Sequence, residues 1–309
     1  MPRPFRFGTG VFRIESATDY AEAARRIESL GYSTFVLPDH FHSEGLAPVP
    51  ALLAAANATT ALRVGSLVFD NDFRHPALLA KEAATLDLLS SGRLEFGIGA
   101  GWKKSEYDQA GISWDDAKVR VSRLDEAVRL IKLLWSGDPI TFHGDHYGVT
   151  ELISYPRPAQ DPHPPVFIGG AGRRLLSLAA QEADIVGIIA QALPGGGLNV
   201  KRDSESLVRG KIQWVREAAG ERFSRIELQS LIWRVVVTQN RETAAAAIAP
   251  NHKMSAEEVL ASPYFLIGTI DRMVEELIRQ RVEFGISYFV VFPGDFEAFA
   301  PVVATLAGS

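Results

Sequence analysis

Short apolar runs rich in β-branched and aromatic residues alternate with longer amphipathic patterns from one end of the chain to the other. Such alternation is typical of parallel strands joined by crossover helices. Eight runs are predicted to be strands, over residues 5–12, 32–38, 62–69, 93–99, 165–170, 184–190, 226–238 and 286–292. The segments between them carry apolar residues at helical spacing, as in "HPALLAKEAATLDLLSSG", where Pro76 and Gly92 mark the predicted start and stop.

Eight alternating units favour one α/β architecture over another. A doubly wound sheet usually has fewer strands, so the pattern predicts a (β/α)₈ TIM barrel with insertions, folded as a single domain over residues 1–309. The polar, turn-rich segment at about 138–165 is expected to lie outside the repeat, and the glycine-rich segment at about 191–204 is predicted to be a mobile loop. Thr18 is the expected N-cap of the first helix.

Composition and charge argue against several classes of function. The 309 residues are 47% hydrophobic and 22% charged, as in a soluble globular protein. A net charge of −5 without a basic stripe argues against a nucleic-acid partner, and the absence of a long uninterrupted apolar run argues against a membrane span. A chain without cysteine has no thiolate chemistry and suits a cytoplasmic location. Redox chemistry would therefore come from a cofactor.

The stretch "TFVLPDHFHSE" places Asp39, His40, His42 and Glu44 directly after the second predicted strand, where a barrel carries its chemistry. His40 and His42 with Asp295 would begin a metal site, but the fifth and sixth predicted strands end without histidine. One imidazole beside a substrate is enough for acid–base chemistry near neutral pH. A third interpretation is that Asp39 begins a turn and His40 packs against its neighbours.

The stretch "FGIGAGW", residues 96–102, carries three alternating glycines at the end of the fourth predicted strand. Glycines at a strand end let the backbone approach a flat ring or a phosphate. The match to a dinucleotide-binding fingerprint is incomplete, because Trp102 and two lysines follow instead of a third correctly spaced glycine. The indole of Trp102 could form a wall of a substrate pocket.

A second glycine turn, "FIGGAGRR", joins the fifth predicted strand to a helix. Backbone N–H groups at a helix N-terminus can hold an anion, and Arg173 and Arg174 add charge and forked donors. The turn is therefore either a phosphate site or a tight turn with two arginines in solvent.

Taken together, these stretches resemble the luciferase-like monooxygenase superfamily, and specifically its branch that uses the deazaflavin coenzyme F420. The resemblance rests on "LPDHF", "RVGSLVFDNDFRHPALLAKEAATLDLLSSGRLEFGIGAGW", "PVFIGGAGRRLLSLAAQEADIV" and "IGTIDRMVEELIRQRVEFGISYFVVF". These stretches span most of the chain in the order that the family has them. The resemblance implies a barrel that binds the coenzyme ring at the C-terminal ends of its strands.

The resemblance also implies roles for individual residues. Asp39 corresponds to the acid that contacts the deazaflavin, and His40 to the imidazole that donates a proton or stabilises the ring. Leu67 and Val68 occupy the place of a non-proline cis peptide that bulges against the ring. The remaining cofactor residues are backbone positions along the ring and a phosphate loop that the two arginines complete: Gly99, Ala100, Gly101, Ala171, Gly172, Arg173 and Arg174.

Two substrate-side positions depart from the F420-dependent glucose-6-phosphate dehydrogenases of this branch. Those enzymes have a glutamate where this chain has Trp102, and a tryptophan where it has Glu44. Both residues are expected to border the substrate pocket, and both substitutions argue against sugar-phosphate oxidation.

The leading functional hypothesis is an F420-dependent oxidoreductase that moves a hydride between the deazaflavin C5 and a small organic substrate, with His40 handling the proton. The alternatives are an FMN-dependent two-component monooxygenase of the same fold, a non-catalytic flavin-binding protein, and a metallohydrolase. The resemblance also implies a homodimer, and no structural metal is expected.

Overall fold

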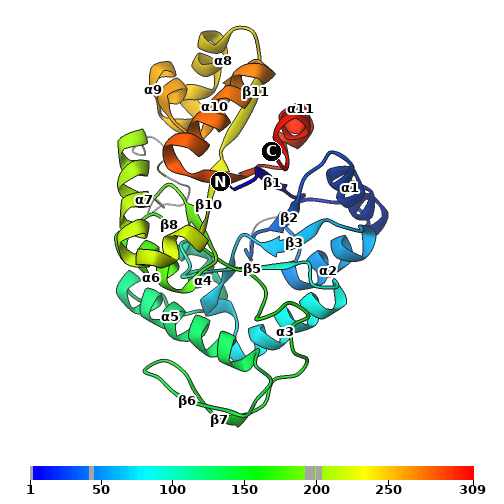
Figure 1. Cartoon of the computed structure of the whole chain (residues 1–309), viewed down its shortest axis with the longest axis vertical. Coiled ribbons are helices and arrows are strands. Elements are labelled where there is room, and N and C mark those ends of the chain that lie inside the picture. The colour runs from blue at the N-terminus through cyan, green and yellow to red at the C-terminus, as the bar shows by residue number, and fades with distance from the viewer. Residues whose placement is uncertain (1–2, 42–44, 192–198, 200–203) are drawn as a thin grey trace.

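The computed structural model describes residues 3–41, 45–191, 199 and 204–309. Eight parallel strands form its centre, with the β3–β5 pairing closing the ring in the order β3-β2-β1-β13-β10-β9-β8-β5. This closed barrel confirms the predicted (β/α)₈ fold (Figure 1). Its strands are β1 (Arg6–Thr9), β2 (Thr34–Leu37), β3 (Arg63–Ser66), β5 (Leu94–Gly99), β8 (Val166–Gly170), β9 (Ile185–Ile188), β10 (Glu227–Ile232) and β13 (Ile286–Val291).

Helices surround the barrel, and their ends follow local sequence signals (Figure 1). Pro76 begins α3, Gly285 ends α10 in the left-handed conformation, and Thr269 caps α10 through the backbone N–H of Arg272. Ser16, not Thr18, caps α1 by accepting from the Asp19 N–H, which corrects the predicted cap. The helices around the barrel are α1 (Ala17–Ser29), α2 (Pro48–Ala58), α3 (Pro76–Leu89), α5 (Ala117–Leu134), α6 (Arg173–Glu182), α7 (Glu205–Ala219), α10 (Ile270–Phe284) and α11 (Phe296–Leu306).

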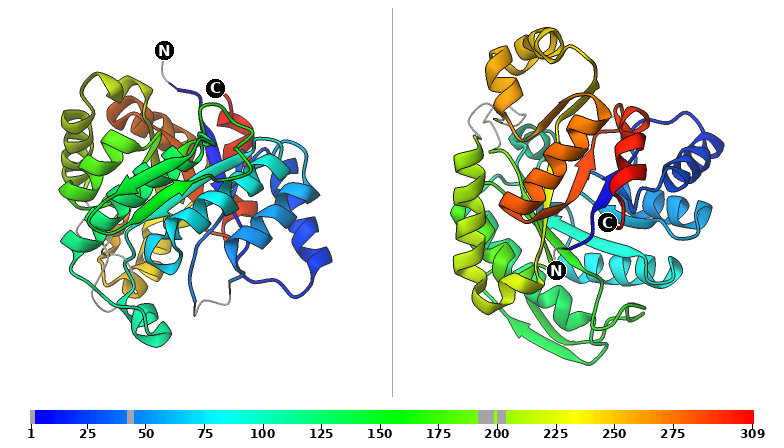
Figure 2. Two further views of the ribbon diagram at one scale, coloured as in Figure 1. Left: turned by 90° about the horizontal axis from the view of Figure 1, so that it is seen from below. Right: turned by 45° about the horizontal axis from the view of Figure 1, so that its top comes forward.

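Two insertions lie outside the repeat. The segment at 138–165 contains an antiparallel hairpin of β6 (Ile140–His143) and β7 (Gly148–Leu152), which lies beyond α5 in Figures 1 and 2. Glu126 anchors it by accepting the backbone N–H groups of residues 145–147. The second insertion holds β11 (Arg234–Val237), α8 (Arg241–Ile248), α9 (Ala256–Ala261) and β12 (Phe265–Gly268), with β11 and β12 forming a separate parallel pair.

Two predicted strands are broken in the structure. The run 226–238 leaves the barrel after Ile232, because its second half pairs with β12 in the separate sheet. The run 62–69 is interrupted at Leu67 and Val68, and the short β4 (Phe69–Asp70) resumes pairing with β5. The predicted loop at 191–204 falls almost entirely outside the described residues.

Apolar side chains pack in two regions. One lies between the barrel and its helices, and the other fills the barrel interior with Val36, Phe167, Ile185, Tyr288 and Val290. In the part of the chain that the structure describes, no helix is long and apolar enough to cross a lipid bilayer.

Candidate functional site

The side chains that face the barrel interior are charged near the N-terminal ends of the strands and apolar near their C-terminal ends. Along β10, the residues that face inward are Glu227, Gln229 and Leu231, as the two-residue period of a strand requires. At the N-terminal end, Arg6 bonds Glu227 at 2.7 Å and Glu95 at 2.5 Å. Ion pairs therefore fill this end, and the site must lie at the other.

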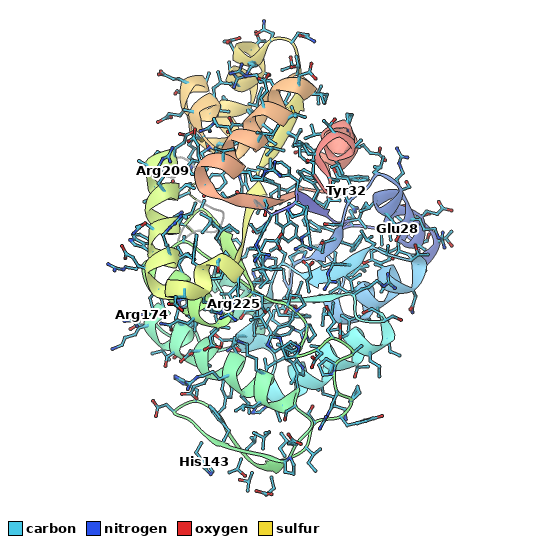
Figure 3. The ribbon with its side chains drawn as sticks, in the orientation of Figure 1. Glu28, Tyr32, His143, Arg174, Arg209 and Arg225 are labelled. Carbon is cyan, nitrogen blue, oxygen red and sulfur yellow. The ribbon has the colours of Figure 1, made fainter. Side chains whose placement is uncertain are left out.

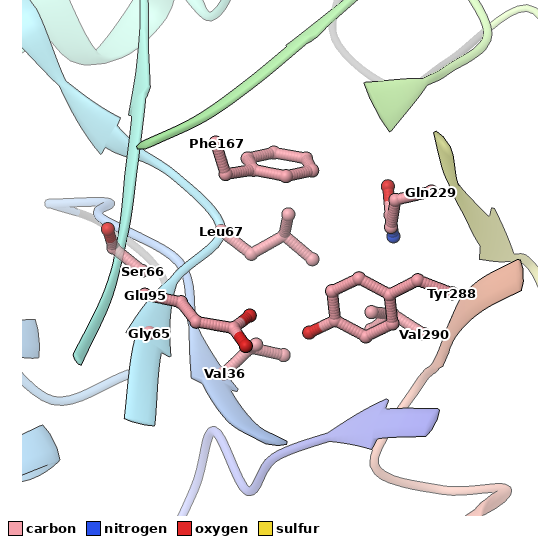
Figure 4. A pocket seen from close by; sticks show the side chains of 9 residues that line it. All are labelled: Val36, Gly65, Ser66, Leu67, Glu95, Phe167, Gln229, Tyr288 and Val290. Carbon is pink, nitrogen blue, oxygen red and sulfur yellow. The ribbon is translucent and has the colours of Figure 1, made fainter. Parts of the chain in front are cut away.

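The barrel interior has room only for a very small molecule. Figure 4 shows the nine residues that line its cavity, among them Leu67, Glu95 and Phe167. The cavity holds about 10 Å³, roughly the space of one water molecule. A tricyclic ring cannot enter it, so such a ring would bind beyond Leu67, at the C-terminal ends of the strands.

The peptide between Leu67 and Val68 is cis, which confirms that expectation. Both side chains are partly exposed at the end of β3. The glycines of β5 make room for this bulge: a Cβ on Gly99 would lie 2.7 Å from Val68 Cγ2, and one on Gly97 would lie 2.0 Å from the Ser66 carbonyl oxygen. These two glycines thus let β5 pack directly against the bulge.

Asp39 is buried at the end of β2, and most of its hydrogen-bonding capacity is already used. Arg74 donates to it from both terminal nitrogens, at 2.5 and 3.3 Å, and the Asp70 backbone N–H donates at 3.2 Å. A carboxylate has about four lone-pair sites, so Asp39 keeps capacity for one further donor. Arg74 holds the carboxylate in one orientation.

His40 follows Asp39 and contacts two residues that come after β5. Its Nδ1 lies 2.9 Å from Oε2 of Glu106, whose side chain is only 1% exposed, and its ring meets the Trp102 ring edge-on at 5.7 Å. A carboxylate only accepts hydrogen bonds, so Nδ1 carries the proton of this bond. Nε2 has no hydrogen-bond partner among the described residues. The imidazole is thus held by one nitrogen and available at the other.

Glu106 lies on α4 (Lys104–Ala110), a short helix that the sequence analysis did not predict. Lys103 Nζ approaches its second oxygen at 3.4 Å. Neither the strand pattern nor the glycine motif points to Glu106. A signal was present nonetheless, because Glu106 is an acid in the segment that directly follows the fourth predicted strand, where a barrel carries its chemistry.

Behind the site lies a buried acidic network. The Tyr107 hydroxyl donates to Asp70 at 2.7 Å and to Asp72 at 3.2 Å. Burial raises the pKa of Asp70 to about 7, although the bond from Tyr107 opposes the shift. Gly101, with φ of 70°, fits against this network, because a Cβ there would lie 1.9 Å from the Tyr107 hydroxyl. The structure therefore requires a glycine at position 101 whether or not a ligand binds nearby.

The two arginines that follow the glycine turn after β8 lie in different surroundings. Arg173 pairs with Glu217 of α7 at 3.3 Å, and Arg174 is exposed on α6, at the outer edge of the molecule in Figure 3. Gly172 at the start of α6 borders open space, so its backbone is accessible. The contribution of Ala171, Gly172 and the arginines to phosphate binding remains a prediction.

The residues weighed for a metal site do not assemble around His40. His143 lies on the β6–β7 hairpin, remote from the barrel (Figure 3). Asp295 is buried and accepts the Val235 N–H at 2.9 Å while pairing with Arg234, so it joins β13 to β11. Among the described residues no group of three His, Asp or Glu side chains could hold a metal ion. His42 and Glu44 lie outside the described residues.

Residues 4–263 match the model of the luciferase-like monooxygenase family. The chain belongs to this family. Its members are flavin- or deazaflavin-dependent oxidoreductases, and their barrel is the fold described above. A solved F420-dependent secondary alcohol dehydrogenase, in complex with an F420–acetone adduct, has the same fold with a TM-score of 0.78 and 22% identity over 98% of both chains.

Curated relatives divide between two cofactors. An F420-dependent glucose-6-phosphate dehydrogenase of Nakamurella multipartita is 32% identical over 84% of this chain and 78% of its own length. Its counterpart from Amycolatopsis mediterranei is 35% identical, but the matched part spans about half of either protein, 54% and 51%. An FMNH₂-dependent dimethylsulfone monooxygenase of Pseudomonas putida is 36% identical over 43% of this chain and 36% of its own.

Proposed function

We propose that this luciferase-like protein is an F420-dependent oxidoreductase that transfers a hydride between the deazaflavin C5 and a small organic substrate. The observation that carries the proposal is the group at the ends of β2, β3 and β5: His40 bonded to Glu106, beside the Leu67–Val68 cis peptide. The relative with broad coverage that is named for F420 supports the choice of coenzyme.

The residues present fit a flat ring at this end of the barrel. Leu67 and Val68 are apolar and partly exposed, so they offer a surface for one face of the ring. Asp39 has a free acceptor position for a ring N–H or hydroxyl. The accessible backbone at Gly172 begins a helix whose N-terminus favours a phosphate.

When bound, the deazaflavin would supply two-electron hydride chemistry at C5. The chain's own share is positioning and proton transfer. With Nδ1 bonded to Glu106, His40 presents Nε2 to the substrate and can give a proton to it or take one from it.

Binding of purified coenzymes tests this proposal directly. We expect F420 fluorescence to be quenched on titration with the protein, with a Kd in the micromolar range or below, and FMN to bind at least about tenfold more weakly. The proposal fails if F420 at micromolar concentration gives no saturable quenching.

The second candidate is an FMN-dependent monooxygenase, which the dimethylsulfone monooxygenase relative favours. Under this alternative, the protein would consume oxygen when supplied with FMN, NADPH and a separate flavin reductase. Oxygen uptake that rises with added protein and with a sulfone or aldehyde substrate, together with the reverse order of coenzyme affinities, would favour it.

A further inference from the structure

One polar side chain in the barrel interior makes no hydrogen bond to the protein. Gln229 lies on β10 with none of its surface exposed, and neither its amide oxygen nor its amide nitrogen has a partner among the described residues. Buried amides without a partner are rare in native proteins, because the folded state then loses the hydrogen bonds that water gave to the group. A partner from outside the chain is therefore expected for this amide.

The side chains closest to the amide oxygen are not hydrogen-bond donors. At the level of Gln229, the neighbouring strand β9 carries Gly187, which pairs with Gln229 in register. A Cβ on Gly187 would lie 3.0 Å from Oε1 of Gln229 and 2.6 Å from Cζ of Phe167. The amide oxygen therefore lies beside a residue that has no side chain and near a ring that is apolar.

Gln229 also lines the cavity in the barrel interior (Figure 4). The cavity volume of about 10 Å³ is close to what one water molecule requires, and a buried water needs about two to four polar partners. Besides the Gln229 amide, the lining includes the carboxylate of Glu95 and the hydroxyl of Tyr288. Arg6 and Arg63 both donate to Oε1 of Glu95, so Oε2 keeps capacity to accept a hydrogen bond. The lining thus offers enough polar groups for one water molecule.

The rest of the lining is apolar, which makes a dry cavity the alternative. Val36, Leu67 and Val290 contribute only hydrocarbon side chains, and cavities with wholly apolar walls stay dry. Gln229 decides between the two cases. A dry cavity leaves a buried amide without a hydrogen bond, whereas a water molecule can donate to Oε1 or accept from Nε2.

We propose that the barrel encloses one ordered water molecule, which hydrogen-bonds the amide of Gln229 and donates to the carboxylate of Glu95. The proposal is independent of the coenzyme and of the reaction. Glu95 lies on β5 and Gln229 on β10, and β8 and β9 separate these two strands in the barrel. The water therefore connects two strands that are not hydrogen-bonded to each other, and it contributes to the stability of the barrel.

A high-resolution crystal structure of the coenzyme-free protein tests the proposal directly. We expect one density peak in the cavity, about 2.7–3.2 Å from an amide atom of Gln229 and from Oε2 of Glu95. In Gln229→Leu, which replaces the amide by an apolar group of similar size, the peak should be lost. An empty cavity in the wild-type crystal would overturn the proposal, and a peak that persists in Gln229→Leu would overturn the part assigned to Gln229.

A double-mutant cycle tests the proposal in solution. Val36→Ile adds one methyl group to a side chain that lines the cavity, and the added volume should expel a water molecule. In the wild-type background we expect the thermal midpoint to fall by about 2–4 °C, because the Gln229 amide loses its partner. In the Gln229→Leu background the same methyl group fills an apolar space, so the midpoint should stay unchanged or rise.

The coupling between the two substitutions separates a hydrated cavity from a dry one. In a dry cavity the effect of the added methyl group does not depend on the amide. An equal shift of the midpoint in both backgrounds, in either direction, would therefore overturn the proposal. Val186→Ile is the matched control, because Val186 is buried on β9 but packs in the core between the barrel and its helices. Its effect should be the same with and without Gln229.

Discussion

The two ends of the barrel both carry buried charge, but they use it differently. At the N-terminal end, Arg6 bonds Glu95 and Glu227 and lies 4.3 Å from the Tyr288 ring, while Arg63 bonds Glu95 at 2.8 Å. Each group there is satisfied by its neighbours. These ion pairs fill the N-terminal end of the barrel.

At the C-terminal end the ion pairs are one-sided. Arg74 and the Asp70 N–H leave Asp39 one acceptor position, and Glu106 occupies Nδ1 of His40 but leaves Nε2, so each pair keeps bonding capacity for another partner. The same interaction type thus closes one end and orients reactive atoms at the other. What distinguishes a site from a structural ion pair here is the unused bonding capacity, not the burial of charge.

Replacing His40 should have the largest effect on activity. His40→Ala removes the proton donor, and general acid–base catalysis typically contributes 10²–10⁴-fold in rate. We expect kcat to fall by roughly that factor, with F420 affinity close to wild type. Stopped-flow measurement of coenzyme oxidation, alongside fluorescence titration, would detect the loss. A hydride-transfer rate within about threefold of wild type would remove His40 from the mechanism.

Replacing Arg6 at the N-terminal end of the barrel should lower the stability of the protein but not its catalytic rate. Arg6→Met leaves Glu95 and Glu227 buried without their shared partner, and breaking a buried ion pair by removing one member costs roughly 3–5 kcal/mol. We expect a markedly lower denaturation midpoint. The matched control is Arg26→Met, because Arg26 and Glu297 are paired but about half exposed, and an exposed pair of this kind contributes little to stability. Equal midpoints for the two variants would contradict the distinction between the two ends.

The buried acid behind the site should make stability depend on pH. The pKa of Asp70 rises from 3.8 to about 7 because burial disfavours its charged form. Between these pH values the folded state keeps a proton that the unfolded state loses, so this contribution to stability declines as pH rises from about 4 to 7. The negative charges of Asp72 and Asp39 also raise the pKa of Asp70, while the hydrogen bond from Tyr107 lowers it.

Asp70→Asn imitates the protonated acid at every pH. Relative to wild type, its thermal midpoint should improve by a few °C between pH 5 and pH 8. Asp108→Asn, at an exposed pair with Lys104, should show no such trend. A gap between Asp70→Asn and wild type that stays constant across this range would show that Asp70 titrates normally.

The sequence pattern was sufficient for the barrel because each strand and helix obeys a local period. It also pointed to Asp39 and His40, since chemistry in a barrel follows strand ends. The cis peptide between Leu67 and Val68 was expected only from the family resemblance. The sequence pattern missed the division of 226–238 into β10 and β11, because both halves are equally apolar and only the pairing with β12 separates them. It also missed Glu106, whose role depends on a contact 66 residues apart in sequence.

A substitution of Glu106 should have the smallest effect of these changes, and it tests one specific contact. It touches neither coenzyme nor substrate in the proposed arrangement, so it is a positioning residue that acts through His40. Glu106→Gln keeps the size of the side chain, but its amide can donate as well as accept, which releases the constraint on the imidazole tautomer. We expect kcat to fall by about tenfold while KM changes little.

The decisive readout for Glu106 is the tautomer and not the rate. In ¹⁵N-histidine spectra of the coenzyme-free protein, wild-type His40 should carry its proton on Nδ1 when neutral, because the carboxylate can only accept. In Glu106→Gln the two tautomers should mix, and Glu106→Asp should partly restore both the spectrum and the rate. A slower Glu106→Gln enzyme with an unchanged His40 spectrum would mean that Glu106 supports the fold of α4 and does not orient the imidazole.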